Sequence, residues 1–160
     1  MELLFVYGTL LTDLKYPEGE KLRALANFIG KGQVSGTLYN LGEYPGLVAD
    51  NETSSSVLGE VYDLSGCPNL WAELDEYEGV NDSGFPEYTR EKVLVSTANA
   101  TLTCWTYIYQ GIVQNIEPIS SGDYLSYIKK KEDHRGDGET KGLRELRDQG
   151  GGKDDIEKNL

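Results

Sequence analysis

The carboxylate of Glu78 stands at a position where an amphipathic helix would carry an apolar side chain. With roughly 100° between successive helical residues, one face of the segment is an apolar stripe, and Glu78 projects within it. The apolar members of this stripe are Leu70, Trp71, Leu74 and Tyr77. Because contact with apolar surface disfavours the charged form of a carboxyl, we expect a raised pKa for Glu78. A carboxyl of raised pKa suits general acid and base catalysis near neutral pH.

The residues around Glu78 indicate how its side chain would be held. Glu73 and Glu76 fall on the opposite, solvent-facing side of the same helix. Gly79 predicts that the helix ends in a left-handed cap, which would fix Glu78 in the last turn. The alternative is a frayed helix end, at which Glu78 extends into water and has no catalytic role.

A second candidate is the segment Phe-Val-Tyr-Gly-Thr-Leu at residues 5–10. A buried strand that stops at Gly8 and Thr9 leaves consecutive backbone N–H groups without partners on a neighbouring strand. Such a run of amides forms a concave donor site for an anion. The segment therefore predicts a site for a substrate carboxylate or an oxyanion, and a structural turn is the alternative interpretation.

Tyr88 and Arg90 form a third candidate, because residues two apart on a strand project from the same face. An exposed aromatic side chain and a surface cation are the alternative for this pair.

The histidine content excludes several kinds of catalytic site. His134 is the only histidine of the chain, and it lies in a polar, glycine-rich segment. A Ser-His-Asp or Cys-His triad, or a metal site with several imidazoles, cannot be assembled from the body of the chain. We therefore expect neither a metal nor a cofactor, and chemistry carried by carboxylates, hydroxyls and backbone amides.

Charge and hydropathy exclude two classes of partner. The 160 residues include 15 Lys plus Arg against 27 Asp plus Glu, which gives a formal charge of -12. Without a basic cluster among aromatic residues, nucleic acid is not an expected partner. No apolar run is long enough to cross a bilayer and no secretion signal is recognisable, so we expect no membrane partner and a cytoplasmic location. Cys67 and Cys104 lack a CxxC spacing and are expected to be reduced and half-buried, although a disulfide stays open.

The chain divides into a folded domain at residues 1–131 and a polar, charged segment at 132–160, which is expected to be a disordered tail. Strands are expected at residues 3–7, 34–41, 57–64, 88–95 and 102–109. Helices are expected at residues 18–28, 68–78 and 122–131. Glycines between and within the strands suit the tight bends of a small barrel. These patterns predict an α+β fold, a small mixed β-barrel with packed helices.

The order of these segments closely resembles the gamma-glutamylcyclotransferase-like superfamily, including its AIG2-like and gamma-glutamylamine cyclotransferase branches. The resemblance runs from about residue 1 to residue 131. It rests on FVYGTL at 5–10, LYNLGEYPG at 38–46, GEVY at 59–62, LDEYEG at 74–79 and YTR at 88–90.

The resemblance implies that Glu78 is the catalytic acid/base. It also implies that a loop and one tyrosine line the substrate pocket, namely Tyr7, Gly8, Thr9, Leu10 and Tyr88. Arg90 matches a recurrent position to which no role is assigned. The implied reaction converts a small gamma-glutamyl amine or gamma-glutamyl amino acid to 5-oxoproline and a free amine. The sequence leaves open the leaving amine and the oligomeric state.

Two other kinds of function stay open at this point. The same fold could be a catalytically silent module that binds a small acidic ligand, or an interaction protein that acts through its charged tail.

Overall fold

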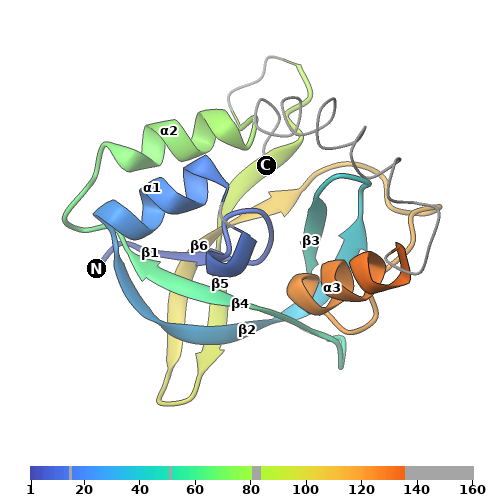
Figure 1. The fold of residues 1–160 in the computed structure, drawn as a ribbon. Coiled ribbons are helices and arrows are strands. Elements are labelled where there is room, and N and C mark those ends of the chain that lie inside the picture. The colour runs from blue at the N-terminus through green and yellow to red at the C-terminus, as the bar shows by residue number, and fades with distance from the viewer. Residues whose placement is uncertain (15, 51, 81–83, 136–160) are drawn as a thin grey trace.

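Six strands of this computed structural model form one mixed sheet that closes on itself (Figure 1). The structure describes residues 1–14, 16–50, 52–80 and 84–135. The strands are β1 (Leu3–Val6), β2 (Asn27–Asn40), β3 (Pro45–Ala49), β4 (Ser56–Asp63), β5 (Tyr88–Thr97) and β6 (Thr101–Tyr109). The helices are η1 (Thr12–Leu14), α1 (Pro17–Leu25), α2 (Leu70–Tyr77) and α3 (Tyr124–Arg135).

The strand pairing closes a ring in the order β1, β4, β2, β3, β6 and back to β1. The β1–β6 and β3–β6 contacts are parallel, and the remaining pairs are antiparallel. β5 forms a long antiparallel hairpin with β6 and also pairs with β2 at Gly32 and Gln33. The predicted α+β barrel with packed helices is therefore confirmed. Closure leaves the side chains of β1 buried, as its pattern of four buried residues shows.

The boundary between α1 and β2 differs from the prediction. The helix expected at 18–28 ends at Leu25, and Ala26 is already extended (φ -101°, ψ 164°). Phe28 belongs to β2, which begins at Asn27 because Asn27 and Phe28 pair with Asp63 and Tyr62 of β4. The prediction failed because the apolar residues keep a helical spacing up to Phe28, although Phe28 pairs with β4 as part of a strand.

β3 is a strand that the sequence analysis missed. Its first residues, Pro45 and Gly46, are unfavourable in strand interiors. They are tolerated here because Pro45 stands at the start of the strand and pairs with Asn40 at the end of β2. β3 also contacts β6 through Leu47 and Ile108, which completes the ring.

The end of α2 has the geometry that Gly79 predicted. Gly79 has a φ of 75°, in the left-handed region. Its N–H donates to the carbonyl of Glu76 at 3.1 Å, and the N–H of Val80 donates to the carbonyl of Asp75 at 3.0 Å. This pair of bonds is a Schellman motif, with Glu78 as the C-cap residue. The backbone of Glu78 is thus fixed at the helix end.

The core fills the barrel and the space beneath α1 and α2, which lie side by side on one side of the sheet (Figure 1). Residues with no exposed surface include Leu4, Phe5, Leu22, Leu38, Leu47, Val57, Val61 and Leu64. Both cysteines are free thiols, as expected; Cys67 is half-buried as predicted, whereas Cys104 is buried in the core.

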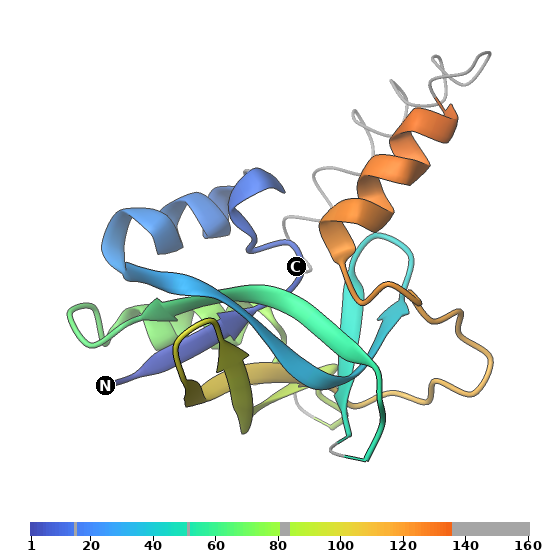
Figure 2. The same ribbon diagram turned by 90° about the horizontal axis from the view of Figure 1, so that it is seen from below.

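α3 lies apart from α1 and α2, beside β3 (Figure 2). The side-chain amide of Asn40 donates to the hydroxyl of Tyr127 at 2.7 Å, which ties α3 to the end of β2. The helix continues to Arg135, past the expected domain boundary at residue 131. The rest of the predicted tail, residues 136–160, lies outside the described residues. Within the described ranges, no helix has both the length and the apolar character needed to cross a membrane.

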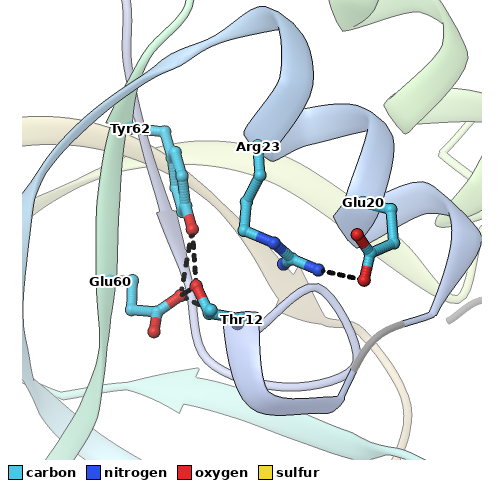
Figure 3. Close-up of polar contacts among 5 residues, drawn as sticks. All are labelled: Thr12, Glu20, Arg23, Glu60 and Tyr62. Atoms are coloured by element: carbon cyan, nitrogen blue, oxygen red, sulfur yellow. Dashed lines mark hydrogen bonds and ion pairs between the residues drawn. The ribbon is translucent and has the colours of Figure 1, made fainter.

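A buried polar cluster holds the chain just after residues 7–10 (Figure 3). Thr12 donates both its backbone N–H (3.1 Å) and its hydroxyl (3.0 Å) to Oε1 of Glu60 on β4. The hydroxyl of Tyr62 lies 2.9 Å from Thr12 Oγ1 and 3.2 Å from Glu60 Oε1. Arg23 of α1 extends above this cluster and pairs with Glu20 at 2.8 Å. The cluster fixes the turn that leads from β1 into α1.

We predict that Thr12→Val destabilises the protein by about 1–3 kcal/mol, because the change removes the hydroxyl and leaves the buried Glu60 with one donor fewer. Urea denaturation would measure the loss. Thr101→Val, at an exposed position of β6, is the control and should change the free energy of unfolding by less than about 0.5 kcal/mol. Equal stability of the two variants would contradict a structural role for the Thr12 cluster.

Candidate active site at the end of helix α2

A small cavity of about 20 Å³ lies where α2 ends over the mouth of the barrel. It brings together the site residues that the family resemblance implied: Tyr7, Gly8, Thr9, Leu10, Glu78 and Tyr88. Its remaining lining residues are Phe5, Val6, Pro45 and Tyr107. Residues from the N-terminus, from α2 and from the second half of the sheet thus meet at one cavity.

Glu78 is the acidic group of this cavity. Its side chain is 8% exposed. Burial raises the pKa of Glu78 well above its ordinary value, and the negative charges of Glu87 and Asp75 raise it further. Among the described residues, no hydrogen bond or ion pair engages the Glu78 carboxylate, yet its oxygens are not sealed from the cavity. The frayed, solvated helix end is therefore not what the structure contains.

Asp75, one turn earlier on α2, is in a different situation. Its carboxylate accepts hydrogen bonds from Arg90 Nε at 2.9 Å, Arg90 Nη2 at 3.1 Å and the Tyr107 hydroxyl at 2.8 Å. Two carboxyls of one helix end thus have opposite environments, which is a common way to separate a structural anion from a proton carrier. Asp75 is held by three hydrogen bonds, whereas the Glu78 carboxyl has none among the described residues.

The loop of residues 7–10 faces Glu78 across the cavity. The Tyr7 hydroxyl donates to the carbonyl of Tyr107 at 2.7 Å and accepts from the N–H of Leu47 at 3.2 Å. The Leu11 N–H donates to the Gly8 carbonyl at 3.0 Å, so the chain turns directly after the strand. Within the described parts of the chain, the N–H groups of Gly8 and Leu10 have no acceptor. This arrangement is compatible with the expected anion site.

Position 8 needs a glycine because the ring of Pro45 lies close to it. Its backbone angles do not require one, since its φ is not positive. A Cβ at this position would lie 2.8 Å from Cγ and 3.0 Å from Cδ of Pro45. The carbonyl of Pro45 in turn accepts a hydrogen bond from the Tyr88 hydroxyl at 2.7 Å. Gly8 therefore allows the loop of residues 7–10 to pack directly against Pro45, which is bound to Tyr88 in the cavity wall.

Tyr88 and Arg90, the third candidate of the sequence, lie in different environments. Tyr88 is 2% exposed and forms part of the cavity wall, so the exposed aromatic of the alternative interpretation is absent. Arg90 is partly buried and does not line the cavity, but binds Asp75 beside it. On the opposite face of β5, Thr89 and Glu91 interact with each other, as strand alternation requires.

The phenols around the cavity stay protonated near neutral pH. Burial, aided by the charge of Glu78, raises the pKa values of Tyr7, Tyr88 and Tyr107 well above the ordinary value of 10.0. They therefore contribute neutral hydroxyls, and Glu78 is the lining group that titrates at lower pH. Among the residues that the structure describes, no group of three or more His, Cys, Asp or Glu side chains could hold a metal ion.

Sequence reasoning missed Pro45, Tyr107 and Glu87. Pro45 lies in the LYNLGEYPG segment but carries no reactive group, and Tyr107 is one of several aromatic residues of a strand. Glu87 acts on Glu78 only through its charge. Barrel closure brings these three residues to the site, and no local spacing could have indicated them.

The comparisons with known proteins agree with the fold and the motifs. The family described as "Gamma-glutamyl cyclotransferase, AIG2-like" matches residues 4–126. The Escherichia coli K12 gamma-glutamylcyclotransferase family protein YtfP is 33% identical over 128 residues, which are 79% of this chain and 98% of that protein. A Vibrio cholerae relative is 37% identical over 129 residues, 79% of this chain and 97% of its own length.

Solved structures show the same architecture. The crystal structure of YkqA from Bacillus subtilis matches with a TM-score of 0.64 at 27% identity, over 82% of this chain and 42% of that protein. The family match covers most of the chain and includes the residues that line the cavity from β1, α2 and β5. This chain therefore belongs to the gamma-glutamyl cyclotransferase, AIG2-like family.

Proposed function

We propose that this protein is a cyclotransferase that converts a small gamma-glutamyl amine or gamma-glutamyl amino acid to 5-oxoproline and a free amine. Glu78 is the general acid/base of the reaction. One observation carries the proposal: the carboxyl of Glu78 is buried, has a raised pKa and has no hydrogen-bond or ion-pair partner among the described residues, and it shares a small cavity with the loop of residues 7–10.

The reaction needs one proton carrier. Ionised Glu78 removes a proton from the α-ammonium of the substrate, and the freed amine attacks the γ-carbonyl carbon of the same molecule. A new C–N bond closes the five-membered ring, and the carbonyl oxygen becomes an oxyanion. When the oxyanion collapses, the bond to the leaving nitrogen breaks and Glu78 returns its proton to that nitrogen. The ring nitrogen still carries a second proton, which passes to the released amine, so that the amine leaves as an ammonium ion and Glu78 is again ionised. A carboxyl whose pKa lies nearer to neutral serves both steps better than an ordinary one.

The remaining groups bind and fold the substrate. The amides of Gly8 and Leu10 supply donors for the α-carboxylate or the oxyanion, since neither has an acceptor among the described residues. The reaction requires a bent glutamyl chain, in which the amine lies close to the carbonyl carbon. Holding the reacting atoms together in this way supplies much of the acceleration of an intramolecular reaction.

Replacing the proton carrier tests the central assignment. Glu78→Gln keeps the volume of the side chain but removes its titratable proton, so we expect the rate to fall by about 10² to 10⁴. Release of 5-oxoproline from a panel of gamma-glutamyl amines, gamma-glutamyl amino acids and glutathione would measure the effect and identify the leaving amine.

Glu76→Gln is the matched control, because Glu76 lies on the exposed side of the same helix. It should retain wild-type turnover. Wild-type turnover by Glu78→Gln would remove Glu78 from the mechanism. Binding of gamma-glutamyl compounds without any turnover by the wild-type protein would favour a catalytically silent binding module.

The raised pKa of Glu78 also predicts a pH dependence of stability. As pH rises above the ordinary value of 4.5, the unfolded chain loses the Glu78 proton before the folded protein does, so this group lowers stability progressively. The loss grows up to the folded-state pKa and is then constant. Glu78→Gln should therefore match the wild-type Tm below pH 4.5 and exceed it increasingly toward neutral pH. A Tm difference that does not change with pH would contradict a raised pKa.

The close contact at Gly8 gives a further test. A methyl group at this position must displace the ring of Pro45, and with it the loop and the cavity wall. We predict that Gly8→Ala lowers kcat/KM by at least about 10-fold while the protein remains folded. Gly66→Ala is the control, because a Cβ there meets nothing within 4 Å. Unchanged kcat/KM in Gly8→Ala would mean that the loop does not shape the substrate site.

A further inference from the structure

Arg90 makes an unusual set of contacts at the helix that carries Glu78. Its guanidinium binds the Asp75 carboxylate through two parallel bonds, Nε to Oδ1 at 2.9 Å and Nη2 to Oδ2 at 3.1 Å. The guanidinium carbon also lies 4.5 Å from the ring centre of Trp71 and 4.9 Å from that of Trp105. Aromatic contact and a bidentate carboxylate bond together hold the planar fork in one orientation. Three elements, α2, β5 and β6, are joined at this one side chain.

Tyr107 connects these contacts to the cavity. Its hydroxyl donates to Asp75 Oδ1 at 2.8 Å, and its side chain lines the cavity. Its backbone carbonyl accepts the hydroxyl of Tyr7, which is the first residue of the substrate loop. A displacement of Asp75 would therefore reach both the helix end and the loop.

The charges around Glu78 come from several elements. Asp75 on α2 and Glu87 before β5 are the anions that act on it. The phenols that its charge affects are Tyr7, Tyr44, Tyr77, Tyr88 and Tyr107. Arg90 is the cation bound to Asp75, and its field lowers the pKa of Tyr107 against the stronger effect of burial. Arg90 thus balances one of the two anions next to Glu78.

We propose that Arg90 is a positioning residue for Glu78: by binding Asp75, which also accepts from Tyr107, it fixes the last turn of α2 over the cavity, and it offsets part of the charge of Asp75 beside the proton carrier. This inference rests on the proposed acid/base role of Glu78. Asp75, which Arg90 binds, is also part of the Schellman motif, because its backbone carbonyl accepts from the N–H of Val80. Side chain and backbone of Asp75 therefore hold the same turn.

The two parts of the proposal predict different effects of three variants. Asp75→Asn removes an anion and leaves Arg90 unbalanced, so the acid limb of the kcat/KM profile should move to lower pH. Arg90→Gln leaves Asp75 unbalanced, so the acid limb should move to higher pH. We expect each shift to be on the order of one pH unit. Arg90→Lys keeps the charge but loses the fork, so it should keep the wild-type midpoint and lower kcat by roughly 10-fold or more.

The titration of Glu78 should be followed directly as well, by carboxyl carbon NMR with Glu78→Gln as the assignment standard. Glu73→Gln is the control, because Glu73 is exposed on the same helix and pairs with Lys21. It should leave the midpoint and kcat unchanged.

Opposite shifts in Asp75→Asn and Arg90→Gln support the charge-balancing role, and shifts of the same sign or no shift overturn it. Wild-type kcat in Arg90→Lys overturns the positioning role, whereas a lower Tm alone would indicate a structural contact only. If no gamma-glutamyl compound releases 5-oxoproline but the NMR midpoints of Glu78 still move in opposite directions, the proposed function fails and the electrostatic role of Arg90 stands.

Discussion

The candidate site is built around one unfavourable interaction, the burial of the Glu78 carboxyl with no hydrogen-bond or ion-pair partner among the described residues. A charged group in apolar surroundings is costly unless it is paired, and here the cost appears as a raised pKa. A side chain under such strain would turn outward if the helix end could fray. The Schellman motif at Gly79 and the contacts of Asp75 prevent this, because they fix the backbone on both sides of Glu78. The burial that raises the pKa of Glu78 is thus also what makes its charged form costly.

The barrel supplies the rest of the environment. Parallel pairing of β1 with β6 places Tyr7 next to Tyr107, and pairing of β5 with β6 places Tyr88 in the opposite wall. The hydroxyls of these phenols are engaged with backbone carbonyls or with Asp75, so they shape the cavity without competing for the proton of Glu78. A site with one titrating group suits the proposed intramolecular reaction, in which the substrate supplies its own nucleophile.

Much of this site could be predicted from local sequence. The helical stripe around Glu78, the cap at Gly79 and the strand that ends at Gly8 are short-range patterns, and each has the predicted geometry. The errors fall where long-range pairing decides the conformation. Phe28 continues a helical spacing but pairs with Tyr62 in a strand, and Pro45 begins a strand although its type disfavours one. Local propensity is a weak preference that tertiary contacts override.

The sequence by itself determined which groups are chemically available: a carboxyl within an apolar stripe, a strand that stops at a Gly-Thr turn, and a body without histidine. It also determined the family, because the order of short motifs is a property of the chain alone. Only the tertiary structure decided that the Asp75 carboxylate is paired with Arg90, while the Glu78 carboxyl has no such partner among the described residues. The reason is that pairing depends on distances across the barrel, between residues that no sequence period connects.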